Sequence, residues 1–230
     1  MSAVYLIRHG QASFGAADYD RLSERGETQA RVLGGTLAAL SPRIGAVISG
    51  DMLRHRQTAQ GCLQAMGRAA DWQVDAGWNE FDHVGVIDAL HPDDAGHARL
   101  RAELMAAPDP KRAFQAMFEQ AVVRWVGGGH DDDYVETWQA FRARCRAALA
   151  SVLDALPHGT DALVFTSGGP IAALAQDLLR IPDSDGFRLN WSLVNCGVTK
   201  LVRGRDGLRL STLNGHAHFE GEHAALVTYR

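Results

Sequence analysis

The stretch that decides the fold is Val4-Tyr5-Leu6-Ile7-Arg8-His9-Gly10-Gln11-Ala12. Its four apolar residues from Val4 to Ile7 are typical of a strand that is buried on both faces of a sheet. The strand then ends in a guanidinium, an imidazole and a glycine, and glycine lets the backbone turn closely past a ligand. We interpret Arg8 and His9 as an anion pocket with a nucleophile or base at its floor; a structural Arg-His pair is the alternative.

Two more apolar runs have the same form as the first. Residues 46–48 precede Ser49-Gly50-Asp51 and a helical pattern from about 52 to 66, and residues 162–166 precede Ser167-Gly168-Gly169-Pro170 and a helix through Leu179. Ligands of parallel sheets bind beyond the carboxyl ends of the strands. The pattern therefore predicts that three segments distant in sequence meet in one pocket.

The remaining periodic segments complete the prediction of the fold. Ser23 is a candidate cap for a helix with a leucine stripe through Leu40, and residues 134–156 carry the clearest helical stripe in the chain. Residues 198–202 and 208–213 alternate around a glycine-rich turn, as the strands of a hairpin do. We predict an α/β, three-layer helix-sheet-helix fold with a mostly parallel central sheet and a C-terminal antiparallel hairpin.

The middle of the chain has a looser pattern, which we interpret as a helical insertion or lid at about 80–133 within a single domain of residues 1–230. Pro108 and Pro110 divide it into helical pieces near 93–107 and 111–126. A hinge-like glycine-rich loop follows and ends in the acid triplet Asp131-Asp132-Asp133. Because the triplet lacks regular ligand spacing, we interpret it as a solvated charge run, and we predict no metal site.

Composition is that of an ordinary soluble protein, with 46% hydrophobic and 22% charged residues. A net charge of -4 without a long basic block argues against a nucleic-acid partner. The apolar runs are too short to span a membrane and no signal peptide is evident, so we expect a cytoplasmic location. We interpret the three cysteines as buried free thiols. The five tryptophans provide apolar area for the core or for a homodimer interface.

Two arginines give the predicted pocket its chemistry. Arg8 and Arg54 are guanidinium forks that can each bind an oxyanion through two hydrogen bonds, and two such forks suit phosphate. Arg56 is two residues from Arg54 on one helix, so at most one of them faces the pocket. Backbone N–H groups of Gly168 and Gly169 at a helix N-terminus would add donors. No glycine-rich loop with a lysine follows any strand, so we expect no nucleotide cofactor, or any other cofactor.

Three motifs in order carry a resemblance: residues 6–11, residues 22–30 and residues 49–59, which read LIRHGQ, LSERGETQA and SGDMLRHRQTA. In these the chain resembles the histidine phosphatase superfamily, the phosphoglycerate-mutase-like proteins. The match is good over the first 60 residues, resumes at 162–174 and is loose in the middle third.

The resemblance implies a metal-independent phosphatase that hydrolyses a small phosphorylated substrate. His9 would attack phosphorus to give a phosphohistidine, while Arg8 and Arg54 neutralise the equatorial oxygens. Glu80 would protonate the leaving alkoxide, with Asp82 as the substitute acid. Ser167 and Gly168 would complete the phosphate-binding set.

The chain also departs from its relatives, which usually carry Ser-His-Gly-Gly where this sequence has Thr166-Ser167-Gly168-Gly169. Ser167 offers one neutral hydrogen bond in place of a stronger charge-assisted bond, so activity could be weakened. His216 or His218 could swing in to compensate, although surface-loop histidines are the plainer interpretation. A catalytically weak module that binds a phosphorylated ligand is therefore an alternative. Mutase-like phosphoryl transfer is another, although no extended basic lid is evident.

A third alternative is a serine hydrolase. Ser167 lies on a strand-turn-helix like a nucleophile elbow, and Asp183 or Asp206 followed by His216 or His218 gives an acceptable chain order. Phe165 stands where that elbow has glycine, and this reading leaves Arg8, His9 and Arg54 without a task.

Overall fold

The computed structural model describes residues 2–13, 20–40, 42–90, 96 and 106–229. The chain forms two compact units: unit 1 comprises Met1–Glu80, Arg144–Ile181 and Asp185–Arg230, and unit 2 comprises Phe81–Ala143 and Pro182–Ser184. Most of unit 2 is the segment in which we expected an insertion. That this segment acts as a lid stays a prediction, and each unit is described by itself below.

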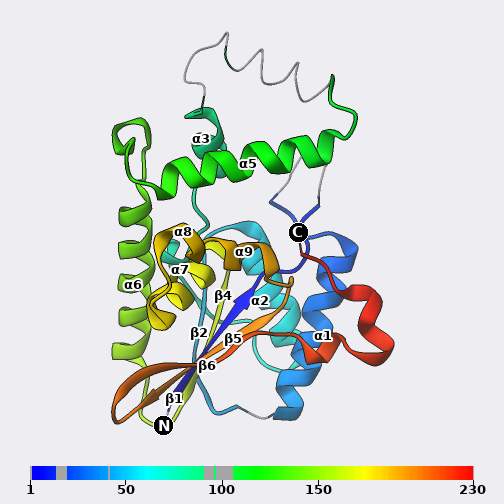
Figure 1. Cartoon of the computed structure of the whole chain (residues 1–230). Helices are drawn as coiled ribbons and strands as arrows, with labels where there is room; N and C mark the ends of the chain where they lie inside the picture. Colours follow the sequence, from blue (N-terminus) through cyan, green and yellow to red (C-terminus); the bar gives the residue numbers. More distant parts are fainter. Residues whose placement is uncertain (1, 14–19, 41, 91–95, 97–105, 230) are drawn as a thin grey trace. The chain divides into compact units, whose positions relative to one another are not determined.

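A six-stranded sheet in the order β3-β2-β4-β1-β5-β6 forms the centre of unit 1 (Figure 1). Strands β1, β2, β3 and β4 pair in parallel, whereas β5 pairs antiparallel with both β1 and β6. The predicted mostly parallel sheet with a C-terminal hairpin is thus confirmed. The strands are β1 (Ser2–Arg8), β2 (Ile44–Ser49), β3 (Gln73–Val74), β4 (Asp161–Thr166), β5 (Val198–Gly204) and β6 (Gly207–Gly215).

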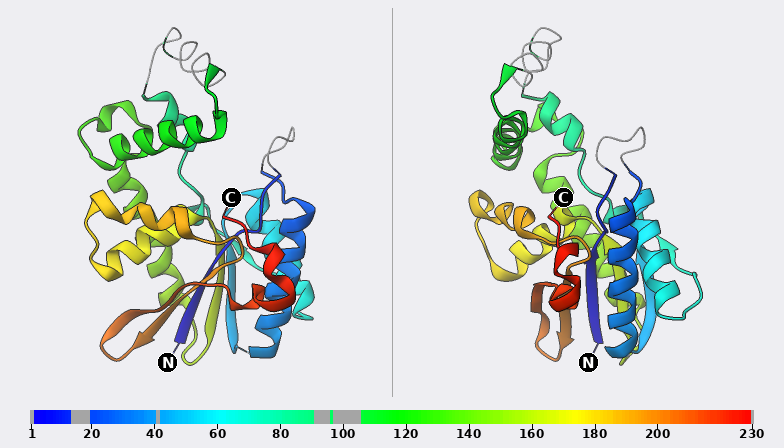
Figure 2. Two further views of the ribbon diagram at one scale, coloured as in Figure 1. Left: turned by 45° about the vertical axis from the view of Figure 1, so that its right-hand side comes forward. Right: turned by 90° about the vertical axis from the view of Figure 1, so that its right-hand side faces the viewer.

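The apolar run of β1 lies between β4 and β5 and is covered on both faces. Because side chains alternate along a strand, Ile7 joins Leu163 and Phe165 of β4 in a core with α1 (Glu24–Leu40) and α2 (Leu53–Ala65). Leu6 and Val164 are completely buried on the opposite face. Figure 2 shows the sheet between α1 and α2 on one side and α7 (Gly168–Leu179) on the other, which are the three predicted layers.

Helix α1 begins where the sequence predicts, at the residue after Ser23. The hydroxyl of Ser23 accepts a hydrogen bond from the Gly26 N–H at 3.1 Å and caps α1. Gly34 allows α1 to approach α2, since a Cβ there would lie 2.3 Å from the Cys62 carbonyl oxygen. Helix α7 is buried along most of its length, because its small and apolar residues follow directly on the buried strand β4.

The core of unit 2 is built from aromatic rings. Phe81 stacks on Trp125 with ring centroids 4.8 Å apart, Trp138 meets Trp125 edge-on at 5.2 Å, and Phe141 packs against all three. The rings are contributed by the start of this unit, by α5 (Pro110–Val126) and by the first turns of α6 (Trp138–Ala155). Helix α6 begins at Trp138, four residues after the predicted start of the helical stripe, and Trp138 and Phe141 of that stripe are core, as expected.

The middle segment departs from prediction at one point. Residues 79–83 read as a polar loop, but helix α3 (His83–Asp88) begins at its end, because the Asp82 carboxylate accepts hydrogen bonds from the N–H groups of Val84 and Gly85. The helix predicted near 93–107 lies almost entirely outside the described residues, whereas α5 corresponds to the second piece. The other short elements are η1 (Ala76–Trp78), η2 (Asp131–Asp133), α8 (Asp183–Gly186), α9 (Arg188–Ser192), η3 (Ala217–Phe219) and η4 (Gly221–Leu226).

Two further predictions concern the whole chain. The cysteines Cys62, Cys145 and Cys196 are free and buried, as predicted. In the part of the chain that the structure describes, no helix has the length and apolar character needed to cross a membrane.

Candidate functional site

The tips of β1, β2 and β4 meet at one edge of the sheet in unit 1. The register pairs Arg8 with Thr166 and Ser49 with Phe165, so the three strands end level with one another. The backbone continues this alignment past the strands, because the His9 N–H donates to the Thr166 carbonyl at 2.9 Å. The residues that follow each strand therefore lie together, as the strand-helix pattern predicts.

His9 is buried at this edge and is held in one tautomer. Its Nδ1 lies 2.7 Å from the Gly10 carbonyl oxygen, which can only accept a hydrogen bond, so Nδ1 carries the proton. The other nitrogen, Nε2, is left with a lone pair. Burial, followed by the charges of Arg54 and Arg8 and the neighbouring His55, lowers the pKa of His9 well below its usual value. His9 is thus a neutral imidazole with its proton on Nδ1 and a lone pair on Nε2.

A buried chain of side chains fixes the backbone at His9. The Asn195 amide donates to the His9 carbonyl at 3.0 Å, and the Thr228 hydroxyl donates to the amide oxygen of Asn195 at 2.9 Å. Gln29 of α1 donates in turn to the Thr228 hydroxyl at 2.8 Å. Sequence reasoning missed this network, because Asn195 and Thr228 come from distant segments outside the three motifs; Gln29 does lie in the second motif, residues 22–30.

Arg54 brings its guanidinium to the His9 ring. The Arg54 side chain is almost fully buried, and its Nε donates to His9 Nε2 at 3.2 Å. Its charge is balanced by Asp20, whose carboxylate lies 2.7 Å from Arg54 Nη1 and also accepts from the Leu53 N–H at the start of α2. In this structure a carboxylate is therefore the anion that the guanidinium and the helix N-terminus bind. Sequence reasoning missed Asp20.

Arg56 lies apart from this cluster, as helical spacing predicts. It is exposed and pairs with the Asp51 carboxylate at 2.8 Å. Of the two arginines in the motif, Arg54 is thus the one that reaches His9.

Arg8 is anchored by backbone. Its Nη1 donates to the carbonyl oxygens of Leu193 and of Tyr229, the latter at 2.8 Å. It also lies beside the start of α7, since a Cβ built on Gly168 would be 3.6 Å from Arg8 Nε and only 2.0 Å from the Asn190 side-chain oxygen. A side chain at position 168 would therefore displace the Asn190 side chain.

The start of α7 holds the candidate acid. The Gly169 N–H donates to Glu80 Oε2 at 3.1 Å, so the carboxyl group lies at the N-terminus of a buried helix. The backbone around Glu80 is fixed by Arg144, which donates to the carbonyls of Gly77 and Asn79 at 3.1 and 3.0 Å. Asp82, the substitute acid, serves as the N-cap of α3.

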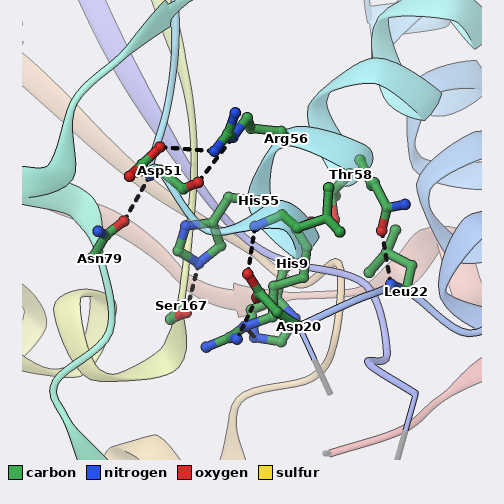
Figure 3. A network of polar contacts seen from close by, with 12 residues as sticks. His9, Asp20, Leu22, Asp51, His55, Arg56, Thr58, Asn79 and Ser167 are labelled. Atoms are coloured by element: carbon green, nitrogen blue, oxygen red, sulfur yellow. Dashed lines mark hydrogen bonds and ion pairs between the residues drawn. The ribbon is translucent and has the colours of Figure 1, made fainter. Parts of the chain in front are cut away.

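A second imidazole lies in the site that sequence reasoning did not single out. His55 is completely buried, its Nε2 lies 2.6 Å from the Ser167 hydroxyl oxygen, and its ring centroid is 5.7 Å from that of His9 (Figure 3). Burial and the charge of Arg54 lower the pKa of His55 well below its usual value. The available signal was its position directly after Arg54 in the third motif.

The two C-terminal histidines have other surroundings. His216 bonds the Asn214 carbonyl through Nδ1 at 2.7 Å, and His218 packs against Phe219, where burial lowers its pKa to about 4. The imidazole that contacts Ser167 is therefore that of His55, rather than that of His216 or His218. Among the described residues, no group of three or more His, Cys, Asp or Glu side chains is placed to hold a metal ion.

Comparison with known proteins gives a family and a set of similar folds. The family model of the histidine phosphatase superfamily (branch 1) matches residues 4–216. No curated protein matches the sequence significantly.

Three solved structures illustrate the likeness of fold. A mycobacterial glucosyl-3-phosphoglycerate phosphatase is 23% identical with a TM-score of 0.58, and the match covers 94% of this chain and 99% of that one. A phosphoserine phosphatase mutant from Entamoeba histolytica is 15% identical with a TM-score of 0.63, covering 95% and 99%. A phosphoglycerate mutase from Bacillus anthracis is 19% identical with a TM-score of 0.62, covering 94% of each chain.

Proposed function

We propose that this chain, which belongs to the histidine phosphatase superfamily (branch 1), hydrolyses phosphomonoesters through a phosphohistidine on His9, without a metal ion. The observation that carries the proposal is the state of the His9 ring. Its Nδ1 proton is held by the Gly10 carbonyl, so Nε2 presents a lone pair beside the guanidinium of Arg54. A neutral, oriented imidazole next to a fixed cation suits attack on a phosphoryl group.

In the first step, Nε2 of His9 forms a bond to phosphorus while the bond from phosphorus to the ester oxygen breaks. Arg54 and Arg8 neutralise the equatorial oxygens, and the Arg54 Nε–H, which donates to Nε2 in the free protein, becomes a donor to one of them. The leaving alkoxide takes a proton from Glu80. Gly169 and the start of α7 support this role by orienting the Glu80 carboxyl group.

In the second step, water attacks the phosphohistidine. Glu80 takes a proton from that water, the bond between nitrogen and phosphorus breaks, and inorganic phosphate leaves with His9 neutral again. A substrate phosphate must also displace the Asp20 carboxylate from Arg54 and from the Leu53 N–H. A phosphate group carries more negative charge than a carboxylate and has three equatorial oxygens. It should therefore compete well for the Arg54 guanidinium and the Leu53 N–H.

The substrate that we propose is a small phosphorylated molecule, and the proposed place of action is the cytoplasm. Two of the similar structures carry the names of phosphatases that act on phosphoserine and on glucosyl-3-phosphoglycerate. A nucleic-acid partner is not part of the proposal, because the net charge of the chain is -4. Hydrolysis is proposed ahead of mutase-like transfer, since the sequence carries no extended run of basic residues that would suit a second phosphate.

The second candidate is a weak enzyme that chiefly binds a phosphorylated ligand. It is favoured by the neutral hydroxyl of Ser167, at a position where the family resemblance leads us to expect an imidazole, together with the Asp20 carboxylate on Arg54. A serine hydrolase is less well supported. Ser167 has relaxed, extended backbone angles of φ -111° and ψ 176°, unlike the strained turn of a nucleophile elbow.

The test uses an aryl phosphate and a panel of phosphoesters on the wild-type chain and on His9→Ala, with and without a chelator. We expect turnover that the chelator leaves unchanged, an acid-labile and base-stable phosphoryl group on His9, and neither in the variant. Tight binding of phosphoesters without turnover would instead support the binding module.

A further inference from the structure

We propose that His55 is a positioning residue that acts through Ser167, and that the two side chains together replace the second imidazole of the site. In this arrangement His55 holds the Ser167 hydroxyl so that it donates a hydrogen bond to a phosphoryl oxygen. The inference rests on the proposed function at His9 and assigns a further part of that same site.

His55 is buried beside polar side chains, and packing alone gives no reason for an imidazole at this position. It is completely buried, and its ring lies 5.7 Å from that of His9 and tilted by 39°. Burying an imidazole is unfavourable unless its nitrogens are hydrogen-bonded. The Ser167 hydroxyl is its partner at 2.6 Å, and this contact joins α2 to the tip of β4 (Figure 3).

The turn after β2 leaves space for the imidazole ring of His55. A Cβ on Gly50 would lie 2.2 Å from His55 Nδ1 and 2.9 Å from the Asn79 side-chain oxygen. Any other residue at position 50 would therefore displace the imidazole. Glycine here makes room for His55 at the edge of the sheet where the three strand tips meet.

The hydrogen-bond partners of the His55 ring indicate which of its two nitrogens carries the proton. Nδ1 of His55 is buried and has no hydrogen-bond partner among the described residues. A buried unpaired N–H is rarer in proteins than a buried unpaired acceptor, so the proton is best placed on Nε2. Nε2 then donates to the Ser167 oxygen, and the hydroxyl proton of Ser167 is directed elsewhere.

The Ser167 hydroxyl is free to donate its own hydrogen bond to a group bound at His9. Ser167 is the N-cap residue of α7 but makes no capping hydrogen bond with its side chain. It follows Thr166, whose carbonyl binds the His9 N–H, and precedes Gly168, which lies beside Arg8. A phosphoryl group on His9 would thus be the acceptor, and a hydroxyl polarised by the N–H of His55 is a stronger donor than an isolated one.

The experiment is a double-mutant cycle with a matched conservative variant. Ser167→Ala removes the hydroxyl, His55→Leu removes the imidazole, and His55→Gln keeps an N–H donor at about the same reach without a group that titrates near neutral pH. We would measure kcat, KM and the pH dependence of kcat/KM for an aryl phosphate. Orthovanadate affinity and the melting temperature would be measured on the same proteins. His216→Leu serves as the control for loss of an imidazole outside the site.

We expect Ser167→Ala and His55→Leu each to lower kcat/KM by about 10- to 100-fold. The double variant should lose no more than either single variant, because the two residues act as one unit. His55→Gln should stay within about fivefold of wild type, and orthovanadate affinity should follow the same order. His216→Leu should leave all of these measurements unchanged.

Three outcomes would overturn the proposal. Additive losses would show that the residues act separately, and a lowered melting temperature with normal kcat/KM in His55→Leu would show a merely structural histidine. Ester hydrolysis that Ser167→Ala abolishes and His9→Ala leaves intact would make Ser167 a nucleophile. If His55→Leu does not fold, Ser167→Ala and His55→Gln still test the pair.

The failure of this inference is distinguishable from failure of the proposed function. If the wild-type chain shows no turnover and no phosphoryl group on His9, the function is wrong. Orthovanadate binding by wild type, Ser167→Ala, His55→Leu and the double variant would still decide whether His55 and Ser167 act on an oxyanion together.

Discussion

The strand tips of unit 1 and the core of unit 2 both bury large side chains, but of opposite kinds. At the strand tips the buried groups are His9, His55 and Arg54, whereas in unit 2 they are aromatic rings such as Trp125 and Trp138. Apolar burial stabilises a fold by about 25 cal/mol per Å², while polar burial is unfavourable unless every group is paired. The aromatic core of unit 2 thus stabilises the fold, whereas the buried polar side chains at the strand tips indicate a functional site.

The largest effect should come from removing the nucleophile. His9→Ala should lower kcat/KM by on the order of 10⁴-fold or more, because no other described group presents a lone pair to phosphorus beside Arg54. Steady-state kinetics with an aryl phosphate would measure this, and thermal melting would check the fold. If His9→Ala kept more than a tenth of the wild-type activity, His9 would not be the nucleophile.

The next effect concerns stability in unit 2. Trp125→Ala should lower the free energy of unfolding by about 3 to 5 kcal/mol, because the indole is completely buried against three other rings. Urea denaturation, with hydrogen exchange followed over residues 106–143, would measure it. Val123→Ala on the same helix is the control, since Val123 is 64% exposed and should change stability by no more than about 0.5 kcal/mol. Equal losses in the two variants would contradict an aromatic core.

A smaller effect should separate the two arginines of the third motif. Arg54→Met should lower kcat by about 10²- to 10³-fold, because it removes a fixed cation from the His9 ring. Arg56→Met should lower it by less than about twofold, since Arg56 pairs with Asp51 in solvent. Parallel kinetics on the two variants would test this. Similar losses in both would mean that the arginine contacts seen here do not persist with substrate.

The smallest effect is a dependence of stability on pH. The pKa values of His9 and His55 are lowered by burial, and that of His218 is lowered to about 4, so each is neutral in the folded protein near pH 6. Unfolding lets each bind a proton below its ordinary pKa of about 6.5, so stability should fall as the pH falls from about 6.5 to 5. Each group can contribute at most about 1.4 kcal/mol per pH unit.

Urea denaturation at several pH values between 7.5 and 5 would measure this slope. His218→Gln should reduce the slope without changing kcat at neutral pH, since His218 lies outside the proposed machinery. Stability that stays constant over this range would show that the histidines are protonated in the folded chain.

Long elements with a regular residue pattern could be predicted from the sequence, and very short elements could not. Strand β1 and helix α1 are long enough to show apolar runs and periodicity, and Ser23 marks the start of α1 as expected. Strand β3 has two residues and α8 has four, which is too short for any period to appear. Their positions are set by neighbours in the sheet and by packing.

The same contrast holds for the site. Helical spacing separated Arg54 from Arg56 because it is a local property of one helix. It gave no reason to choose His55, whose partner Ser167 is 112 positions away. Asp20 was missed for a similar reason, because its contact with Arg54 depends on how the segment before α1 passes the start of α2.

Apolar runs followed by helical patterns are properties of short segments, so the sequence alone predicted that Arg8, His9, Arg54 and Ser167 lie together at the carboxyl ends of three strands. The folded chain was needed to identify the imidazole that contacts Ser167, the carboxylate that balances Arg54 and the amide that holds the His9 backbone. Those pairings follow from sheet order and strand register. Register is a property of the assembled sheet, so no single segment encodes it.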